Sequence, residues 1–293
     1  MKIRGSYVAL VTPMYEDGSI NFDEFERLIE YHIEKKTDGL VILGTTGESA
    51  TLTHEEDEKI VEFVVKHVNK RIPVIAGSGS NNSEVAKVQS QKFEKLGVDG
   101  LLVISPYYNK TNRQGMLDHF LIVADNVNIP VILYNVPGRT GCNIDVDVVG
   151  ELSKHKNIVG IKEASGNISY IAKIAKYVND DFCLLSGNDD MIVPVLSMGG
   201  VGVISVAANI LPNEMHELVM NYLNGKTKEA LSIQLKYLDL INTLFIETNP
   251  IPIKEAMNYL GFNVGGYRLP LTYMDKKNKE TLIKSLSILG GKK

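Results

Sequence analysis

The chain has 293 residues, a formal net charge of -4, 44% hydrophobic residues and 23% charged residues. This composition is ordinary for a globular protein and excludes a strongly basic surface for nucleic acid or an anionic membrane. No run is apolar enough for a signal peptide or a membrane span, so we expect a cytoplasmic protein. Cys142 and Cys183 lack metal-ligand spacing and are interpreted as small buried residues in a reducing compartment.

Short apolar runs alternate with amphipathic segments along most of the chain. The helix that follows the first strand is expected to be capped by Asn21 or Asp23, and Thr53 with Glu56 predicts a capping box for the next helix. Strands are predicted at residues 7–11, 39–43, 72–76, 99–105, 129–134, 158–162, 182–186 and 200–205.

Eight strands separated by helices predict a parallel sheet, because parallel strands need crossover connections. At this length the natural closure is an α/β (β/α)₈ barrel of the TIM type. A doubly wound open sheet is the alternative, although no Gly-x-Gly-x-x-Gly turn follows the first strand. We expect residues 1–224 to form the barrel and residues 225–293 to form a C-terminal helical extension, with helices at residues 227–245, 251–260 and 275–289.

Lys162 closes the sixth apolar run, at the end of a strand that should be buried. Lysine is rarely buried without a partner, because burial disfavours the ammonium form and favours the nucleophilic free amine. One interpretation is therefore a nucleophilic lysine. The other is an ordinary ion pair with the neighbouring Glu163.

Other strand ends carry polar or aromatic side chains, and in a (β/α)₈ barrel the chemistry lies at these ends. Thr45 and Thr46 lie in a glycine-flanked turn that suits a carboxylate or phosphate, or simply caps a helix. Tyr134 ends the strand beside that of Lys162 and could relay protons to it, or could be core packing. Arg139 follows in a glycine-lined loop suited to carboxylate recognition, although most arginines are simply exposed.

Several other chemistries find no support in the motifs. The six histidines lack the spacing of a zinc protease helix, and no Gly-x-Ser-x-Gly elbow or Walker loop is present. Asp189 and Asp190 are adjacent carboxylates whose side chains should point apart, which argues against a metal site.

The ordered motifs resemble the dihydrodipicolinate synthase family, within a superfamily that includes N-acetylneuraminate lyase and keto-deoxy-sugar-acid aldolases. The resemblance covers the whole chain. It is carried by Gly44-Thr-Thr-Gly-Glu-Ser49, Pro106-Tyr-Tyr-Asn109, Tyr134-Asn-Val-Pro-Gly-Arg-Thr-Gly141, Gly160-Ile-Lys-Glu-Ala-Ser165, Leu185-Ser-Gly-Asn-Asp189, Gly202-Val-Ile-Ser-Val206 and Asn249-Pro-Ile-Pro-Ile-Lys254.

The resemblance implies a pyruvate-dependent lyase of the diaminopimelate and lysine pathway that condenses pyruvate with L-aspartate 4-semialdehyde, without a metal or organic cofactor. It implies a Schiff base on Lys162, a proton relay of Tyr134, Thr45 and Tyr108, and a homotetramer in which Tyr108 enters a neighbouring subunit's site. Substrate-binding roles are implied for Thr46, Arg139, Gly187 and Ile204.

The resemblance also implies an allosteric lysine site at a dimer interface, formed in lysine-inhibited members by positions matching Ser49, Ala50, His54, Asn81 and Tyr107. Asp57 and Val85 depart from that pattern, since inhibited members have histidine and glutamate there. We therefore predict weak or absent inhibition by lysine, unless Glu84 takes over the missing carboxylate.

Two other functions compete with this interpretation. A sugar-acid aldolase of the same superfamily would share the barrel and the lysine, but Arg139 favours a small acidic aldehyde. A non-catalytic barrel that binds a keto acid is the alternative from another class, and the presence of Lys162 with Tyr134 and Thr45 argues against it.

Overall fold

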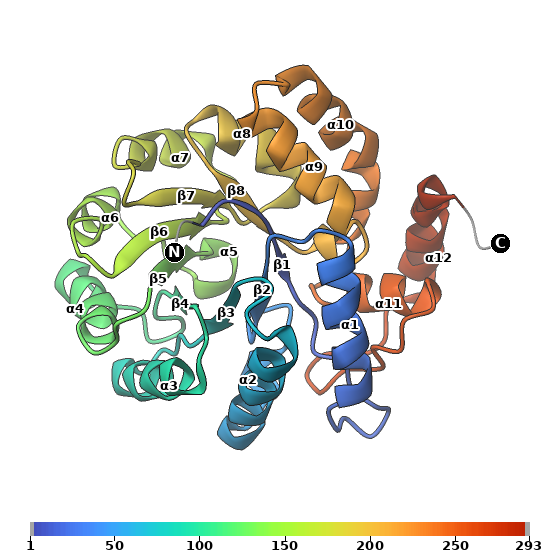
Figure 1. The fold of residues 1–293 in the computed structure, drawn as a ribbon, viewed down its shortest axis with the longest axis horizontal. Coiled ribbons are helices and arrows are strands. Elements are labelled where there is room, and N and C mark those ends of the chain that lie inside the picture. The colour runs from blue at the N-terminus through green and yellow to red at the C-terminus, as the bar shows by residue number, and fades with distance from the viewer. Residues whose placement is uncertain (1–2, 291–293) are drawn as a thin grey trace.

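Eight parallel strands form a closed barrel in the computed structural model of the protein, which describes residues 3–290 (Figure 1). Each strand pairs with the next, and β8 pairs back with β1 through Gly202 and Gly5. This closure confirms the predicted barrel and rules out the open sheet. The strands are β1 Gly5–Ala9, β2 Gly39–Ile42, β3 Val74–Gly77, β4 Gly100–Ile104, β5 Val131–Asn135, β6 Ile158–Glu163, β7 Cys183–Ser186 and β8 Gly202–Ser205.

Helices surround the barrel and cover the outer face of its strands (Figure 1). Asn21 caps the first helix by accepting from the Glu24 N–H, and Thr53 and Glu56 form the predicted capping box. The helices are α1 Phe22–Glu34, α2 His54–Val68, α3 Ser83–Leu96, α4 Arg113–Ala124, α5 Pro137–Thr140, α6 Val146–Leu152, α7 Ile168–Ala175, α8 Ile192–Ser197, α9 Pro212–Leu223, α10 Thr227–Thr243, α11 Ile251–Tyr259 and α12 Lys276–Ser285. Short 3₁₀ turns are η1 Ser49–Thr51, η2 Asp189–Met191, η3 Ala207–Asn209 and η4 Leu286–Leu289.

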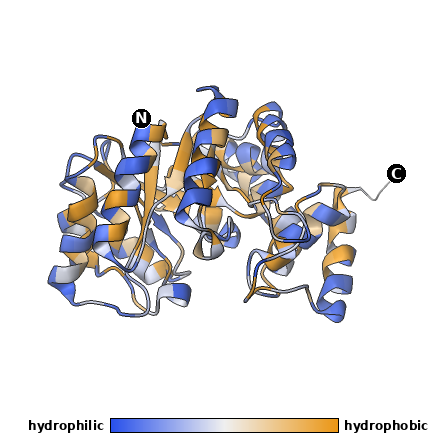
Figure 2. Cartoon of the chain, turned by 90° about the horizontal axis from the view of Figure 1, so that it is seen from below, coloured by the Kyte–Doolittle hydropathy of each residue, from blue (hydrophilic) through white to orange (hydrophobic). Residues whose placement is uncertain are grey.

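The strands are buried on both faces, which is why their sequences are continuous apolar runs and not alternating ones. Leu40, Ile132 and Leu184 have no exposed surface. Figure 2 shows these hydrophobic strands inside a shell of helices whose outer faces are hydrophilic. Helix α1 has the expected apolar stripe, with Phe25, Leu28 and Ile29 facing the core.

The C-terminal helices extend from one side of the barrel, where α11 and α12 form a lobe (Figure 2). The predicted boundary at residue 224 falls between α9 and α10, and the three expected helices correspond to α10, α11 and α12. Helix α10 packs on α9, and its Gln234 side chain donates to the Asp189 carbonyl at 2.8 Å. The extension therefore contacts residues at the ends of barrel strands.

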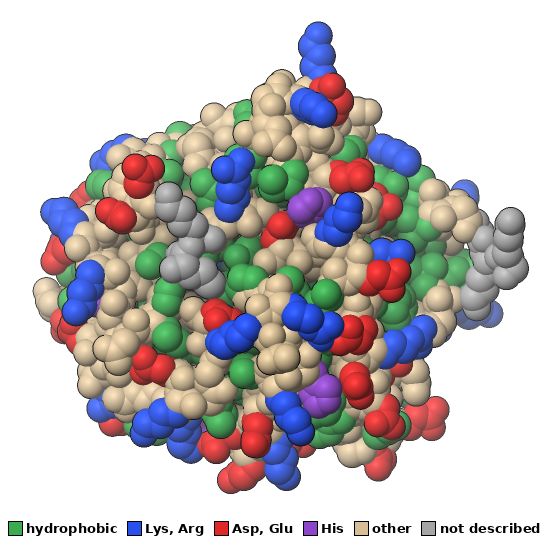
Figure 3. All heavy atoms as spheres, viewed as in Figure 1, with side chains coloured by type: hydrophobic (Ala, Val, Ile, Leu, Met, Phe, Trp, Pro, Cys, Tyr) green, Lys and Arg blue, Asp and Glu red, His purple; other side chains and the backbone are tan. Residues whose placement is uncertain are grey.

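The outer surface carries charges of both signs. In Figure 3, acidic and basic side chains are interspersed over the visible face. Within residues 3–290, no helix is long and apolar enough to cross a membrane. Cys142 and Cys183 are free thiols that pack against the core and are partly buried, so the expectation that both are buried is only partly met.

Candidate active site

Lys162 and Tyr134 lie side by side at the carboxyl ends of β6 and β5. The two residues are direct partners in the strand register, and the Lys162 Nζ lies 4.3 Å from the centre of the Tyr134 ring. Both side chains are buried, with 6% and 7% of their surface exposed. Adjacent parallel strands place these residues together, so the predicted proximity of Tyr134 to Lys162 is confirmed.

The alternative ion pair between Lys162 and Glu163 is wrong, because successive residues of a strand point to opposite faces. Glu163 instead accepts from Asn135 Nδ2 at 2.7 Å and from the Ser165 N–H at 2.6 Å. Burial raises the pKa of Glu163, and these hydrogen bonds oppose the rise. In the described residues Lys162 makes no ion pair within 4.0 Å.

A second buried carboxylate, Asp189, follows β7. It accepts from the N–H groups of Val206 and Ala207 at 3.0 and 2.9 Å. Burial raises its pKa, and the charge of Lys162 is near enough to oppose that rise. Asp189 therefore joins the ends of β7 and β8 and places a carboxyl group in the electrostatic range of the amine. This geometry gives no support to a metal role for Asp189 and Asp190.

Gly187 lies against the Lys162 side chain. A Cβ built on this glycine would lie 3.1 Å from Lys162 Cε and 2.7 Å from Ala164 Cβ. The absence of a side chain at Gly187 thus leaves room for the lysine. Ile204, the other predicted strand-end residue, is fully buried in β8 and does not line the neighbouring cleft.

A cleft of about 480 Å³ opens beside Tyr134, a volume usual for a small-molecule site. Thr45, Tyr134 and Arg139 line it together, as the sequence predicted. Thr46 lies deeper, with 3% of its surface exposed, and its hydroxyl oxygen accepts from Asn249 Nδ2 at 3.0 Å. The Arg139 guanidinium donates to the Asn249 carbonyl at 2.8 Å.

The two tyrosines after β4 have different surroundings. Tyr107 lines the cleft, whereas Tyr108 is 92% exposed and does not. Tyr108 also has a positive φ of 66°, which is uncommon for a bulky residue. Within this chain Tyr108 does not join the predicted relay with Tyr134 and Thr45.

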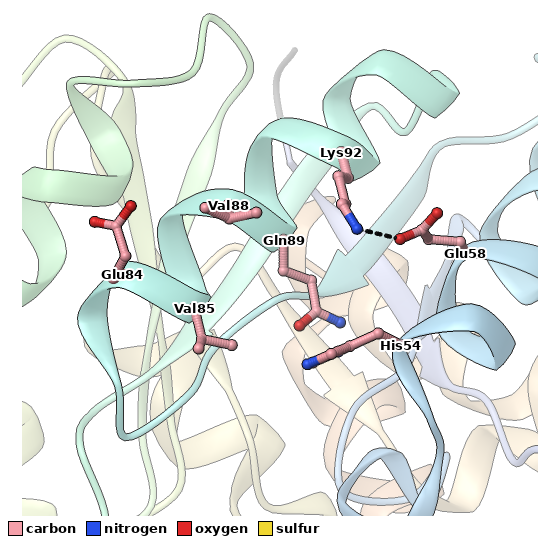
Figure 4. A pocket seen from close by; sticks show the side chains of 7 residues that line it. All are labelled: His54, Glu58, Glu84, Val85, Val88, Gln89 and Lys92. Atoms are coloured by element: carbon pink, nitrogen blue, oxygen red, sulfur yellow. Dashed lines mark hydrogen bonds and ion pairs between the residues drawn. The ribbon is translucent and has the colours of Figure 1, made fainter.

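Four of the five positions of the predicted allosteric set line the same cleft. Ser49, Ala50, His54 and Tyr107 line it, and Asn81 does not. Figure 4 shows a smaller groove nearby, between α2 and α3, in which Gln89 points toward His54. The two residues that depart from the inhibited pattern belong to this region. Val85 lines both hollows, and burial raises the pKa of Asp57 to about 6.

Asp57 also lines the cleft, and its carboxylate is held by neighbouring side chains. Its carboxylate accepts from Gln89 Nε2 at 2.7 Å and lies 3.8 Å from His54 Nδ1. Glu84, the suggested replacement for the missing carboxylate at residue 85, forms an ion pair with Lys87 at 2.7 Å. Figure 4 shows its side chain pointing away from His54.

Three further residues around the site were not assigned a role from the sequence. Asn249 contacts both Thr46 and Arg139, and Lys254 pairs with Glu48 in the turn that carries the threonines. A charged residue inside the apolar run Ile251-Pro-Ile-Lys-Glu-Ala256 was the available signal. Among residues 3–290, no group of three or more His, Cys, Asp or Glu side chains could hold a metal ion.

The comparisons with known proteins agree with this geometry. The model of the dihydrodipicolinate synthetase family matches residues 2–289. The 4-hydroxy-tetrahydrodipicolinate synthase 1 of Clostridium acetobutylicum is 57% identical over 279 residues, which cover 95% of both chains. A dihydrodipicolinate synthase structure from Aquifex aeolicus is 43% identical with a TM-score of 0.95, and covers 97% of both chains.

A third relative, the chloride-inhibited dihydrodipicolinate synthase of Acinetobacter baumannii, was solved in complex with pyruvate. It is 39% identical over 99% of both chains, with a TM-score of 0.96. These matches extend over the barrel and the C-terminal helices alike. They confirm the resemblance drawn from the motifs, and with it a lyase-type enzyme. The chain belongs to the dihydrodipicolinate synthetase family.

Proposed function

We propose that this protein condenses pyruvate with L-aspartate 4-semialdehyde to give 4-hydroxy-tetrahydrodipicolinate, the first committed step of the diaminopimelate and lysine pathway. The observation that carries the proposal is the buried Lys162 amine, 4.3 Å from the Tyr134 ring centre and beside a cleft of about 480 Å³. The curated relative from Clostridium acetobutylicum, which bears the name of this activity, supports the assignment.

In the proposed reaction the neutral Lys162 amine attacks the ketone of pyruvate, and loss of water leaves an iminium ion. The iminium withdraws electrons, so a methyl proton leaves and an enamine forms. The enamine carbon attacks the aldehyde and forms the new carbon–carbon bond. The amino group of the semialdehyde then attacks the iminium carbon, which closes the ring and releases the Lys162 amine. The lysine supplies the electrophilic activation, so we propose no metal or organic cofactor.

Tyr134 and Thr45 are the proposed proton-relay groups in this chain, because both line the cleft next to the lysine. The turn that carries Thr45 and Thr46 is the proposed site of the pyruvate carboxylate. In the described part of the chain, the backbone N–H groups of these two threonines make no hydrogen bond, so they remain available to an anion. The Gly187 and Ile204 carbonyls are proposed to line the pyruvate site.

Arg139 is the proposed partner of the carboxylate of the semialdehyde. It lines the cleft and its guanidinium is anchored at one end by the Asn249 carbonyl. A cation at the mouth suits a small acidic aldehyde better than a polyhydroxylated sugar acid. This contact therefore favours the synthase over the sugar-acid aldolase.

We further propose a homotetramer built from two dimers, in which Tyr108 completes the relay of a neighbouring subunit. The 92% exposure of Tyr108 leaves its side chain free to enter a partner. The predicted cytoplasmic location rests on the composition of the chain and stays a prediction.

Borohydride trapping with pyruvate tests the central step. We expect intact mass to show one reduced pyruvyl adduct, and peptide mapping to place it on Lys162. The matched control is Lys176→Gln, because Lys176 also lies over a tyrosine ring, at 4.8 Å, but on the outer helical layer. Trapping should survive this change and disappear in Lys162→Gln.

Turnover with L-aspartate 4-semialdehyde separates the remaining functions. Condensation with the semialdehyde supports the synthase, and cleavage of sialic acid or ketodeoxygluconate would replace it with the aldolase. A folded protein that binds pyruvate and forms no adduct would instead favour the keto-acid-binding barrel.

A further inference from the structure

A buried ion pair supports the turn that carries Thr45 and Thr46. Lys254 on α11 donates to Glu48 Oε1 at 2.8 Å, and neither side chain has any exposed surface. The ammonium group also donates to the carbonyl oxygens of Thr12 and Gly266, so three acceptors satisfy its three N–H groups. A buried pair is stable only with such complete hydrogen bonding.

The turn itself has an unfavourable backbone conformation on both sides of the two threonines. Leu43 and Glu48 have φ angles of 55° and 56°, and non-glycine residues in this region are uncommon. Such conformations persist only when the surrounding structure fixes them. The turn therefore depends on contacts from elsewhere in the molecule.

Two of those contacts come from residues that lie more than two hundred positions after the turn in the sequence. Lys254 binds Glu48 directly, and the Arg268 N–H reaches Glu48 Oε2 at 3.4 Å. Lys254 also binds the Thr12 carbonyl, and the Thr12 hydroxyl donates to the Gly47 carbonyl at 2.6 Å. The ammonium thus contacts the turn both directly and through the loop that follows β1.

We propose that Lys254 is a positioning residue for the keto-acid site, and that its pair with Glu48 holds the Thr45–Thr46 turn in the geometry that binds the substrate carboxylate. This inference rests on the proposed function and extends it to the C-terminal helices. It assigns the C-terminal helices an indirect part in substrate binding, through Lys254 of α11 and the turn that it supports.

The first readout is the pyruvate concentration that gives half-maximal borohydride trapping of Lys162. The second is the melting temperature. Lys254→Met and Glu48→Gln each leave one buried charge without its partner, so both should lower the melting temperature. The double variant has no unpaired charge, so it should regain most of the melting temperature that each single variant loses. If the pair positions the turn, the double variant still needs roughly ten- to a hundredfold more pyruvate.

Glu255→Gln is the matched control. Glu255 is the next residue on α11 and binds Lys279 of α12 at 2.6 Å, so its loss weakens the C-terminal lobe without touching the turn. We expect its half-saturating pyruvate concentration to equal that of the unmodified protein. If the double variant does not fold, Glu48→Gln alone serves, since it keeps the size and one acceptor oxygen. It should raise half-saturation by about fivefold.

Kinetics separate positioning from simple stabilisation. With the semialdehyde as the varied substrate, the double variant should keep a near-normal KM, because the turn is proposed to hold only the keto acid. A double variant with unchanged half-saturation by pyruvate would overturn the inference, as would an equal shift in Glu255→Gln. A wild-type protein without any pyruvate adduct would instead overturn the proposed function.

Discussion

The sharpest test of the Lys162 geometry is a single methyl group added at Gly187. The backbone there does not require glycine, because its φ lies outside the left-handed region. The added Cβ of Gly187→Ala would lie 2.7 Å from Ala164 Cβ, 3.0 Å from the Glu163 carbonyl oxygen and 3.1 Å from Lys162 Cε. Carbon atoms in contact prefer separations of about 3.5–4.0 Å, so each neighbour is too close.

The direction of the response follows from which neighbour can move. The Glu163 carbonyl and the Ala164 Cβ belong to β6 and the backbone directly after it, so they yield little. The flexible end of Lys162 is the group that shifts, by about half an ångström to one ångström, to restore a normal contact. Overpacking of this kind costs about 1–3 kcal/mol in stability. A misplacement near 1 Å of a reacting group can cost about a hundredfold in rate.

We therefore expect Gly187→Ala to fold and to form the pyruvate adduct about a hundred times more slowly than the unmodified protein. Borohydride added at different times after mixing with saturating pyruvate traps the adduct and measures that rate, and thermal unfolding measures the stability. The matched control is Gly138→Ala in α5, where an added Cβ meets nothing within 4 Å. An unchanged trapping rate in Gly187→Ala would refute the packing argument.

Three further predictions concern the cleft. Burial raises the pKa of Asp57 to about 6, so this carboxyl group lowers the free energy of unfolding progressively as pH rises from about 4 to 6, by at most about 3 kcal/mol. Asp57→Asn should therefore resist urea better than the unmodified protein at pH 7.5 and lose that advantage at pH 4. A difference in stability that does not change with pH would contradict the assignment. Arg139→Leu should raise the KM for the semialdehyde by roughly ten- to a hundredfold through loss of a charge-assisted contact, and should leave pyruvate trapping nearly unchanged. Weaker pyruvate trapping with an unchanged KM for the semialdehyde would exclude the proposed role. Millimolar lysine should leave turnover unchanged, and Val85→Glu should make the enzyme measurably sensitive to it; clear inhibition of the unmodified protein would show that residue 85 is not the deciding position.

Local patterns in the sequence were enough for the secondary structure and for several caps. The eight apolar runs became eight strands, because a parallel strand covered on both faces needs a continuous run of Val, Ile and Leu. Thr53 with Glu56 formed its capping box, since both partners lie within one turn of chain. Some strand ends coincide with their predicted limits and others differ by up to two residues, because the pairing register and not the hydrophobic run decides where a ladder stops.

Interactions between distant residues were not predictable in this way. The interpretation of Lys162 as half of an ion pair with Glu163 was open in the sequence, and the alternation of strand side chains excluded it once the register was known. The partners of Glu163 are Asn135 on the adjacent strand and Ser165 in the following loop. A hydrophobic pattern does not specify such partners.

The sequence by itself therefore determined the eight strands to within two residues of their ends, and which lysine has reason to be unusual. The tertiary structure decided that Tyr134 faces Lys162, that Tyr108 is exposed and does not line its own chain's cleft, and that Asn249 and Lys254 support the Thr45–Thr46 turn. The physical reason is range. Strand propensity and helix caps depend on neighbours a few positions away, whereas the contacts that hold this site join residues as many as 242 positions apart, and only the tertiary fold brings them together.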